Sequence, residues 1–493
     1  MFVVELDRAN FEYDVHSIVK AFYPEEQVTV LIPEMREEKR AQLQAHIRIR
    51  IHIREDGAAI WVDGAEFTWN HQMDSEGGKS PEKAFKDGFK QFFYRKLKQV
   101  TGKSLPWGNL TGIRPTKIAF QLLDLGMDTV EILTYYRERY DVTREKAELS
   151  LAIARREREM LAELSRKDAE KGEGYSLYIG IPFCPTTCLY CSFTSFPIGS
   201  YRNAVDSYID CLIREMEYTA DRCRGMRLDT VYIGGGTPTT LEAWQLERLL
   251  GALKERFDFS QVKEFTVEAG RADSITEEKL QALRRCGVGR ISVNPQTMNQ
   301  HTLDVIGRKA GVRQVEEAFY LARDLGFDNI NMDLILGLPG ETEKEVQHTV
   351  DRVVEMAPDS LTVHSLAVKR ASRLNQWVQE NGVSMLRNTE ETMRIAAEGA
   401  ERLGLVPYYL YRQKNMSGNF ENVGYAKEGK LGLYNVLIME ETQSIIALGA
   451  GSITKLVLPD GRIERSENLK EVALYIEKID EMISRKEQLF GRA

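Results

Sequence analysis

Three cysteines in the middle of the chain have the spacing of a metal-binding loop. Cys184, Cys188 and Cys191 stand in "CPTTCLYC" with the spacing C-x3-C-x2-C. Cysteine thiolates are soft ligands that select zinc or iron–sulfur clusters. A zinc site needs a fourth ligand, and none of the seven histidines lies near this loop. Three thiolates on a four-iron cube leave one iron open to an outside ligand, so the spacing favours a cluster that does chemistry.

A glycine triplet further along the chain indicates a second part of the same site. "GGGTP" occupies residues 234–238, directly after the apolar run "TVYI". Glycine lets backbone groups approach the amino and carboxylate ends of a ligand closely. Alone, such a triplet usually marks only a turn. Together with the cysteine spacing it favours a ligand site.

Short apolar runs alternate with helical patterns after residue 174. Amphipathic patterns such as 240–257 and 276–287 predict helices between the runs. Repeated β/α units form a parallel sheet wrapped by helices, either a barrel or an open part of one. Functional groups are then expected at the C-terminal ends of the strands. The predicted strands cover 175–183, 229–238, 264–270, 289–297, 329–340 and 360–368.

The earlier part of the chain has a different character. Ile47, Ile49, Ile51 and Ile53 alternate with polar residues, which predicts a half-buried strand. The dipeptide Asp-Gly at 56–57 predicts a tight turn into a second strand. Helical patterns then dominate from about 80 to 170. These observations predict an α+β unit with a hairpin-containing sheet followed by helices.

The length of 493 residues agrees with several domains. We predict an α+β N-terminal domain over 1–170 and a β/α domain over 171–385. A smaller C-terminal domain is predicted over 386–493. Its aromatic-rich stretch leads to the glycine-rich "ALGAGS", and an amphipathic helix is predicted over 470–489.

Composition and charge narrow the class of protein. With 43% hydrophobic and 28% charged residues the chain is typical of a globular protein, and a net charge of −8 argues against a surface that coats nucleic acid. The N-terminus is acidic where a signal peptide needs a basic start, and no apolar run approaches a membrane span. We expect a cytoplasmic protein with no nucleic-acid or membrane partner. Cys211, Cys223 and Cys286 are interpreted as structural thiols.

The cysteine motif resembles that of a known superfamily. "CPTTCLYC" is similar to the signature of radical S-adenosylmethionine (SAM) enzymes, in which a [4Fe-4S] cluster binds the amino and carboxylate groups of SAM at its open iron. "YIGIPFC", "YIGGGTPT" and "NMDLILGLPGET" resemble the oxygen-independent coproporphyrinogen III oxidase family, and "LPWGNLTGIRPTK" looks most like its HemZ branch. The resemblance covers 175 to about 370 well and the C-terminal region loosely. It implies a partial (β/α)6 radical SAM barrel with a [4Fe-4S] cluster and SAM as cofactors.

The resemblance also implies individual residues. The cluster ligands fall on Cys184, Cys188 and Cys191. Acidic residues among the implied SAM contacts suit ribose hydroxyls or a sulfonium, and an arginine suits a carboxylate. The implied SAM contacts are Tyr178, Tyr190, Gly235, Gly236, Thr237, Glu268, Gln296, Arg308, Asp333 and Ala367.

The implied reaction is the oxidative decarboxylation of coproporphyrinogen III. A radical derived from SAM takes a hydrogen atom from a propionate, and loss of carbon dioxide and one electron leaves a vinyl group. No single residue is assigned to the chemical step. The implied partners are a tetrapyrrole substrate and an electron donor such as flavodoxin or ferredoxin. Possible substrate contacts are the cations Arg114, Lys117, Arg412 and Lys414, with Tyr408, Tyr409 and Tyr411 flanking the macrocycle.

One departure from the family pattern keeps other functions open. Decarboxylating members carry a further cysteine two residues after the third, whereas this chain has Phe193 there. The related haem-chaperone branch also carries a phenylalanine at this place. A haem chaperone without decarboxylase activity is therefore an alternative, and another radical SAM reaction on a tetrapyrrole is a third. The stretch around Gln296, including "SVNP", also departs from the family pattern.

Overall fold

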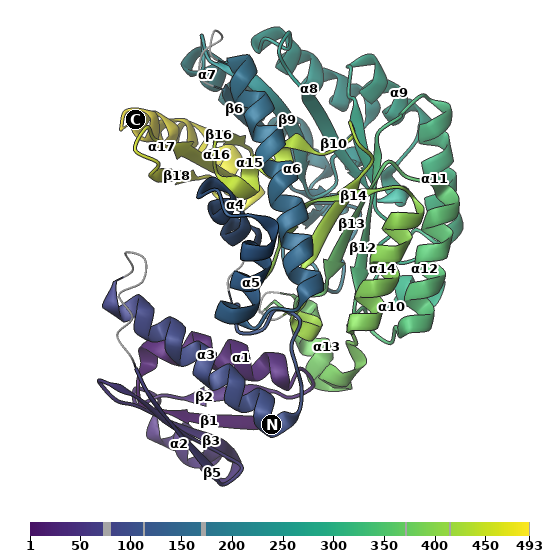
Figure 1. Cartoon of the computed structure of the whole chain (residues 1–493). Helices are drawn as coiled ribbons and strands as arrows, with labels where there is room; N and C mark the ends of the chain where they lie inside the picture. The colour runs from purple at the N-terminus through teal and green to yellow at the C-terminus, as the bar shows by residue number, and fades with distance from the viewer. Residues whose placement is uncertain (72–79, 112–113, 169–173, 370–371, 414–415, 493) are drawn as a thin grey trace. The chain divides into compact units, whose positions relative to one another are not determined.

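The computed structural model describes residues 1–71, 80–111, 114–168, 174–369, 372–413 and 416–492 (Figure 1). The chain divides into two compact units, which are described separately. Unit 1 comprises Met1–Ala154, Val378–Leu386 and Leu410–Glu421, and unit 2 comprises Arg155–Trp377, Arg387–Tyr409 and Asn422–Ala493. The domain boundaries expected from the sequence, at 170/171 and 385/386, stay predictions.

Unit 1 contains a mixed sheet with the strand order β2-β1-β3-β4-β5. β1 pairs in parallel with both β2 and β3, whereas β3, β4 and β5 are antiparallel neighbours. The strands are β1 (Phe2–Leu6), β2 (Val28–Leu31), β3 (Ile47–Ile53), β4 (Gly57–Val62) and β5 (Ala65–Asn70). The helices are α1 (Glu12–Phe22), α2 (Glu37–Leu43), α3 (Pro81–Thr101), α4 (Thr116–Asp124) and α5 (Thr129–Tyr140), and α6 (Arg144–Asp168) begins in unit 1 and ends in unit 2.

The alternating isoleucines form the predicted strand. Ile49, Ile51 and Ile53 are buried while Arg50 and His52 between them are exposed, which confirms the period of two. The turn at 56–57 also forms, because β3 and β4 pair as an antiparallel hairpin. One face of the sheet therefore supplies an apolar core.

Helix α3 completes that core and has clear ends in the sequence. Ser80 caps its first turn by accepting a hydrogen bond from Lys83 N at 3.4 Å. Gly102 ends the helix with a φ of 68°, a conformation that favours glycine. Phe89 and Phe93 on its buried side have no exposed surface and join the sheet residues in one apolar cluster.

Unit 2 is built on parallel strands in chain order. The order β6-β9-β10-β11-β12-β13 is continuous, and each neighbouring pair is parallel. Helices alternate with these strands and lie outside them in Figure 1, which is the geometry of repeated β/α crossovers. The strands are β6 (Gly174–Ile181), β9 (Arg227–Gly235), β10 (Glu264–Gly270), β11 (Arg290–Val293), β12 (Ile330–Leu336) and β13 (Ser360–Ser365), and the helices are α7 (Val205–Arg222), α8 (Ala243–Arg256), α9 (Glu277–Arg285), α10 (Gln300–Val305), α11 (Val312–Asp324) and α12 (Glu343–Met356). All six strands predicted from the sequence are present.

The later part of the chain extends the same sheet at both edges. β15 pairs antiparallel with β13, and β16 pairs in parallel with β6. Within the described residues the sheet has 11 strands in the order β14-β15-β13-β12-β11-β10-β9-β6-β16-β17-β18. The added elements are α13 (Arg373–Asn381), α14 (Glu390–Arg402), β14 (Val406–Tyr411), β15 (Asn422–Ala426), α15 (Leu433–Glu440), β16 (Ser444–Leu448), β17 (Ile453–Val457), β18 (Ile463–Glu467), α16 (Val472–Glu477) and α17 (Ile479–Phe490).

The closing helix differs from the sequence prediction. The amphipathic pattern over 470–489 predicted one helix, but the structure has α16 and α17 with a break at Lys478. Tyr475 on α16 and Lys486 on α17 both donate hydrogen bonds to the buried Glu215. A tertiary contact of this kind overrides local helix propensity.

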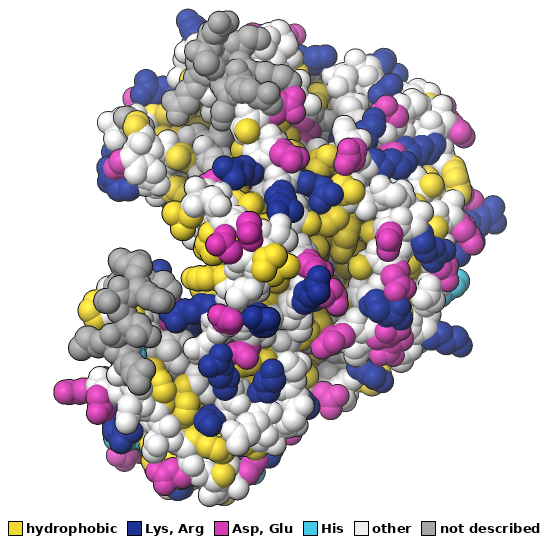
Figure 2. Space-filling model, viewed as in Figure 1, with side chains coloured by type: hydrophobic (Ala, Val, Ile, Leu, Met, Phe, Trp, Pro, Cys, Tyr) yellow, Lys and Arg dark blue, Asp and Glu magenta, His cyan; other side chains and the backbone are white. Residues whose placement is uncertain are grey.

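The surface of the outer helices carries charges of both signs. Figure 2 shows basic and acidic side chains interspersed on this face. Exposed pairs such as Arg313–Glu317, with 2.7 Å between Nε and Oε1, join neighbouring turns of one helix. Such pairs contribute little to stability individually. Among the described residues, no helix combines the length and apolar character needed to cross a membrane.

Candidate active site

The three cysteines lie in the segment that follows the first barrel strand. Cys184 ends β7 (Phe183–Cys184), directly after β6, and β7 pairs with β8 (Phe196–Pro197). The segment from β7 to β8, here called the cysteine loop, is thus closed at its base. Cys188 is buried, whereas Cys184 and Cys191 are half-buried. Inside the loop, Cys191 N donates to Cys188 O at 3.3 Å.

Hydroxyl groups lie beside two of the sulfurs. Cys184 Sγ is 3.4 Å from Thr237 Oγ1, and Cys191 Sγ is 3.8 Å from Ser195 Oγ. Burial raises the pKa of the Cys184 thiol, and the hydrogen bond with Thr237 opposes that effect. Hydrogen bonds to sulfur stabilise the thiolate form that a metal cluster requires.

A buried arginine, Arg271, lies beside the sulfur of Cys188. Arg271 Nη1 lies 3.7 Å from Cys188 Sγ and donates to Thr186 O at 2.8 Å. Asp273 fixes the guanidinium through two hydrogen bonds of 2.9 and 2.7 Å. Arg271 therefore anchors the cysteine loop through Thr186 and lies beside the Cys188 sulfur.

The glycine motif packs directly onto the backbone that leads into the cysteine loop. Gly236 N donates to Ile181 O at 2.8 Å, and Thr237 N donates to Phe183 O at 2.7 Å. A Cβ on Gly236 would lie 2.5 Å from Phe183 O, so no other residue fits without displacing the backbone. Gly235 has a φ of 103°, a conformation that glycine adopts without strain.

Three tyrosine rings, two from neighbouring strands and one from helix α15, stack on one another. Tyr178 on β6 and Tyr232 on β9 have ring centroids 6.3 Å apart and planes at 15°. Tyr434 on α15 stacks on Tyr232 at 4.4 Å and 18°. The Tyr178 hydroxyl also lies close to the glycine motif, because a Cβ on Gly235 would approach it to 3.0 Å. Helix α15 thereby brings a ring from the late part of the chain against the first two barrel strands.

Glu268 on β10 is a carboxyl group with an unusual titration. The Tyr232 hydroxyl donates to Glu268 Oε1 at 2.5 Å. Burial, together with the negative charge of Asp333, raises the pKa of Glu268 to about 7 against the opposing effect of the Tyr232 hydrogen bond. Glu268 therefore changes its charge near neutral pH.

Asp333 on β12 has the opposite behaviour. Its Oδ1 accepts a hydrogen bond from Asn331 Nδ2 at 2.7 Å, and its Oδ2 lies 3.8 Å from His364 Nε2. Burial works toward a higher pKa, but hydrogen bonds with His364, Asn331 and Thr362 hold the pKa of Asp333 below its ordinary value. The sheet interior thus contains one carboxylate that stays ionised and a second, Glu268, that can carry a proton.

Gln296 has a backbone conformation that is rare for its residue type. Its φ is 67°, in the left-handed region that favours glycine. Gln296 N donates to Asp333 O and Ile335 N donates to Gln296 O, both at 2.9 Å. These two bonds hold the buried residue beside β12. Strained backbone at such a place is typical of a functional site.

Arg308 connects the cysteine loop to the segment after β11. Its Nη2 donates to the Tyr190 hydroxyl at 3.0 Å, and its Nη1 donates to Asn294 O at 3.4 Å. Within the described part of the chain, the buried Arg308 Nε and Asn294 Oδ1 have no hydrogen-bond partner. A donor and an acceptor are therefore left for a ligand next to Tyr190.

The structure brings most of the predicted SAM contacts to two places. Tyr190 and Arg308 meet beside the cysteine loop, where the glycine motif also packs. Glu268 and Asp333 influence each other inside the sheet, with Gln296 bonded to Asp333. Ala367 follows β13 and is half-buried. Strand ends therefore gather these residues as parallel β/α topology requires.

The three predicted substrate cations that the structure describes belong to unit 1. Arg114 is half-buried and Lys117 is exposed, both in unit 1, whereas Lys414 lies outside the described residues. Arg412 is buried in unit 1, where it donates to Leu110 O at 2.6 Å and to Asn419 O at 2.9 Å. Burial lowers the pKa of Arg412 to about 10.

Arg412 therefore holds two segments of unit 1 together through backbone oxygens. Of the predicted flanking tyrosines, Tyr408 and Tyr409 are buried in unit 2 and Tyr411 is half-buried in unit 1. Tyr408 accepts a hydrogen bond from Asn435 Nδ2 at 3.0 Å, which ties it to α15.

Sequence reasoning did not identify four residues of this site. Arg271 directly follows β10, so its place at a strand end was an available signal. Tyr232 and His364 stand within predicted strands, and no periodicity distinguished them from structural residues. Tyr434 belongs to a helix far along the chain, and only the tertiary fold stacks it on Tyr232.

The described residues contain no group of three or more His, Cys, Asp or Glu side chains close enough to hold a single metal ion. In a four-iron cube each thiolate binds a different iron atom, so the thiols around a cube do not converge on one point.

Comparison with known proteins assigns the family. Residues 178–353 match the Radical SAM superfamily. A Bacillus subtilis (strain 168) protein named oxygen-independent coproporphyrinogen-III oxidase-like protein HemZ is 40% identical over 428 residues, which cover 84% of this chain and 85% of that protein. The chain belongs to this family of radical SAM proteins.

Other relatives of this radical SAM protein match a shorter stretch. The haem chaperone HemW of Bacillus subtilis (strain 168) is 38% identical over 39% of this chain and 51% of its own length. Oxygen-independent coproporphyrinogen III oxidase of Escherichia coli (strain K12) is 33% identical over 39% of this chain and 42% of its own length.

A solved structure supports the fold of the radical SAM protein. Coproporphyrinogen III oxidase (HemN) from Escherichia coli has a TM-score of 0.51 and 24% identity over 66% of this chain and 73% of that chain. This likeness confirms the expected fold class, a partial radical SAM barrel in a mixed α/β protein.

The cofactors of the superfamily fit the residues present. Radical SAM proteins use a [4Fe-4S] cluster and SAM. The cysteine loop offers three thiols next to hydroxyls and an arginine, and Arg308 and Asn294 leave a donor and an acceptor for a charged ligand. The glycine motif packs closely on Tyr178 and on the backbone that leads into the cysteine loop, where a Cβ on Gly235 or Gly236 would lie within 3.0 Å of other atoms.

Proposed function

We propose that the cysteine loop holds the cluster and that the strand ends around it hold SAM. Cys184, Cys188 and Cys191 would be the three cluster ligands. Arg308 would bind the carboxylate of SAM, because its unpartnered Nε lies beside the Tyr190 that it already contacts. Gly235, Gly236 and Thr237 would give the amino acid part of SAM a backbone surface.

The acidic residues suit the rest of SAM. Asp333 stays ionised and would balance the sulfonium charge. Glu268 would accept from ribose hydroxyls when ionised, and Tyr232 fixes its orientation. Tyr178, Gln296 and Ala367 complete the proposed contacts. When bound and reduced, the cluster and SAM supply a carbon-centred radical that takes a hydrogen atom from an unactivated C–H bond.

We propose oxidative decarboxylation of coproporphyrinogen III as the reaction. The single observation that carries the proposal is the 40% identity over 84% of the chain with a coproporphyrinogen oxidase-like protein. Each propionate that reacts would lose one hydrogen atom, carbon dioxide and one electron, and become a vinyl group. An electron donor such as flavodoxin or ferredoxin would reduce the cluster, and a one-electron acceptor would take the electron lost by the substrate. Arg114 and Lys117 are proposed contacts of the propionates.

The test is an anaerobic turnover with product analysis. The reconstituted chain, SAM, a reductant and coproporphyrinogen III should yield vinyl products with methionine and 5′-deoxyadenosine, as measured by mass spectrometry. The Cys191→Ala variant is the control and should yield neither. Formation of 5′-deoxyadenosine without any change in the porphyrinogen would refute the decarboxylase.

A haem chaperone is the second candidate. Phe193 in the cysteine loop is 76% exposed. The resemblance described above implies a cysteine at this position in decarboxylating members of the family. The 38% identity with the haem chaperone HemW of Bacillus subtilis also supports this candidate. An exposed aromatic ring can pack on a flat macrocycle. Titration with haem should then show stoichiometric binding that Phe193→Ala weakens about tenfold, and transfer of haem to an acceptor without consumption of SAM.

A further inference from the structure

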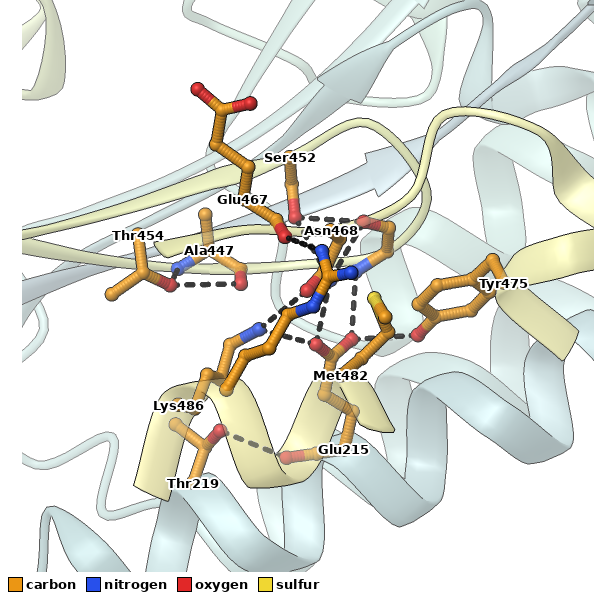
Figure 3. Close-up of polar contacts among 12 residues, drawn as sticks. Glu215, Thr219, Ala447, Ser452, Thr454, Glu467, Asn468, Tyr475, Met482 and Lys486 are labelled. Carbon is orange, nitrogen blue, oxygen red and sulfur yellow. Dashed lines mark hydrogen bonds and ion pairs between the residues drawn. The ribbon is translucent and has the colours of Figure 1, made fainter. Parts of the chain in front are cut away.

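The glycine-rich segment "ALGAGS" at 447–452 rests on a buried polar network (Figure 3). Glu215 on α7 is at its centre and has no exposed surface. The segment lies at the end of β16, the strand next to β6 in the sheet. None of the proposed cofactor contacts belongs to this network. The residues that it contacts therefore indicate what it does.

Both oxygens of Glu215 are fully used as acceptors. Oε1 accepts from Lys486 Nζ at 2.5 Å and from Asn468 Nδ2 at 2.7 Å. Oε2 accepts from Gly449 N at 2.8 Å and from the Tyr475 hydroxyl at 2.6 Å. Figure 3 shows the side chains of Lys486, Asn468 and Tyr475 pointing toward the carboxylate of Glu215. A buried charge with four donors is well compensated, whereas loss of one partner leaves an unpaired charge.

The same network fixes the shape of the turn after β16. Asn468 Nδ2 donates to Gly449 O at 2.9 Å, and Ser452 Oγ donates to the same oxygen at 2.7 Å. Gly449 and Gly451 have φ values of 95° and 71°, in the left-handed region that favours glycine. The turn of residues 449–452 is therefore held by Glu215 of α7, which is itself bound by Lys486 of α17.

The turn touches the entrance of the cysteine loop. A Cβ on Gly449 would lie 2.5 Å from Gly180 O, so the two backbones are in direct contact. The Tyr208 hydroxyl donates to Gly180 O at 2.7 Å and accepts from Ala450 N at 2.9 Å. Gly180 is the next-to-last residue of β6, which leads into β7 and Cys184.

The turn also touches the exit of the cysteine loop. A Cβ on Gly451 would lie 3.1 Å from both Cγ2 and Oγ1 of Thr194. Thr194 precedes Ser195, whose hydroxyl lies 3.8 Å from Cys191 Sγ. The turn therefore contacts the chain on both sides of the three cysteines.

We propose that Glu215 and Lys486 are positioning residues for the cysteine loop. Helix α17, through Lys486, fixes Glu215, and Glu215 fixes the turn that supports both ends of the loop. The segment after β16 is thus part of the cluster site although none of its residues is a cluster ligand. This inference rests on the cluster assignment and is independent of the tetrapyrrole substrate.

The first experiment moves the turn without touching the network. Gly451→Ala adds a methyl group against Thr194, whereas Gly461→Ala is the matched control. Gly461 lies between β17 and β18 with a φ of 79° and nothing within 4 Å of its Cβ position, so Gly461→Ala has a similar backbone strain and its methyl group contacts nothing. Thr194→Ala removes both atoms at 3.1 Å, leaves Thr194 Cβ at 3.2 Å, and should rescue Gly451→Ala in part.

Two readouts follow the loop itself. Alkylation of Cys191 in the metal-free full chain, measured by mass spectrometry, should be about threefold or more faster in Gly451→Ala than in Gly461→Ala, because thiol reactivity follows exposure. After anaerobic reconstitution, Gly451→Ala should hold less than about half of the iron of the wild type and should show an altered change in its electron paramagnetic resonance spectrum on addition of SAM.

The second experiment breaks the ion pair. Lys486→Met leaves Glu215 as an unpaired buried charge, and the double variant Glu215→Gln with Lys486→Met removes both charges at nearly constant volume. Lys486→Met should show fast Cys191 alkylation and raise the KM for SAM about tenfold with a smaller effect on kcat, and the double variant should recover part of both. A purely structural role predicts a lower melting temperature with normal alkylation of the folded chain.

The outcomes separate this inference from the cluster assignment. If the wild-type chain takes up no iron, the cluster assignment fails. If the wild type binds a cluster normally and Gly451→Ala and Lys486→Met match Gly461→Ala in alkylation and spectrum, the positioning role of Glu215 and Lys486 is refuted.

Discussion

The two sheets of this protein bury different kinds of side chain. In unit 1, the covered face of β3 presents Ile49, Ile51 and Ile53, and α3 adds phenylalanines to the same cluster. In unit 2, the strands bring Glu268 and Asp333 into the interior of the sheet together with tyrosine and histidine. An apolar face stabilises a fold directly, whereas buried polar groups cost free energy unless they are hydrogen-bonded. Polar side chains inside the sheet of unit 2 therefore indicate a functional site.

The strands of unit 2 serve both purposes by alternation. Tyr232 stands between the fully buried Val231 and Ile233, and Glu268 follows the fully buried Val267. One face of each strand therefore packs into an apolar layer while the other lines the interior. In unit 1 the second face is exposed instead, as at Arg50. The comparison indicates that the sheet of unit 1 buries an apolar face, whereas the sheet of unit 2 combines apolar packing with a polar site.

The largest effect on the polar site should come from its metal ligands. Cys191→Ala removes one thiolate, and a three-cysteine loop has no spare ligand. We expect iron content after reconstitution to fall to under about a tenth of the wild type and 5′-deoxyadenosine formation to fall at least about a thousandfold. Cys286→Ala, at a half-buried thiol after α9, is the control and should retain both. Normal iron in Cys191→Ala would contradict the assignment.

The glycine motif should be the next most sensitive position. Gly236→Ala places a methyl group 2.5 Å from Phe183 O and 2.8 Å from Ile181 O, and both are backbone atoms that cannot rotate away. We expect SAM binding, measured by equilibrium dialysis, to weaken about 100-fold. Gly251→Ala in α8 meets nothing within 4 Å and should instead stabilise the fold by about 0.5–1 kcal/mol. Equal SAM affinity in both variants would show that the glycine motif is not part of the SAM site.

The raised pKa of Glu268 predicts that the polar interior of the unit 2 sheet makes stability depend on pH. Its pKa of about 7 in the folded chain lies above the ordinary value of 4.5, so the folded state holds a proton that the unfolded state has released. The stabilising contribution is complete below about pH 4.5 and is lost as pH rises toward 7. Glu268→Gln should therefore flatten the melting temperature of the metal-free chain across this range, as measured by differential scanning fluorimetry. Parallel curves for both proteins would show that Glu268 titrates normally.

The smallest effect on the site should come from the core of unit 1. Phe93→Ala empties a position with no exposed surface, and we expect it to cost about 3–5 kcal/mol of stability. Iron content and SAM binding per folded chain should stay within about twofold of the wild type, because the residue belongs to an apolar cluster of unit 1. Urea unfolding with iron analysis of the folded fraction checks both. Loss of the iron–sulfur cluster in Phe93→Ala would contradict the view that the core of unit 1 and the site of unit 2 are independent.

The local patterns of the chain predicted the elements that carry the site. The period-two alternation at Ile49 and Ile51 and the six apolar runs after residue 174 all correspond to strands. The spacing of Cys184, Cys188 and Cys191 predicted the loop after the first barrel strand. Such signals are readable because they depend on neighbours a few positions away.

Long-range partners were outside the reach of those patterns. The pattern over 470–489 gave a single helix, whereas the structure divides it so that Tyr475 and Lys486 both reach Glu215. Glu215 and Lys486 are 271 positions apart, and each alone is typical of a solvated helix face. The hydrogen bonds of Arg412 to Leu110 O and Asn419 O within unit 1 were likewise not predicted by any local pattern.

The sequence by itself determined the strand and helix pattern, the cysteine spacing and the glycines that allow close backbone approach, because these are properties of adjacent residues. Only the tertiary structure decided that Glu268 and Asp333 have opposite pKa shifts, that Arg271 supports Cys188, and that the turn at 449–452 contacts the cysteine loop. Burial and charge pairing depend on which distant segments meet, and that depends on how the whole sheet assembles.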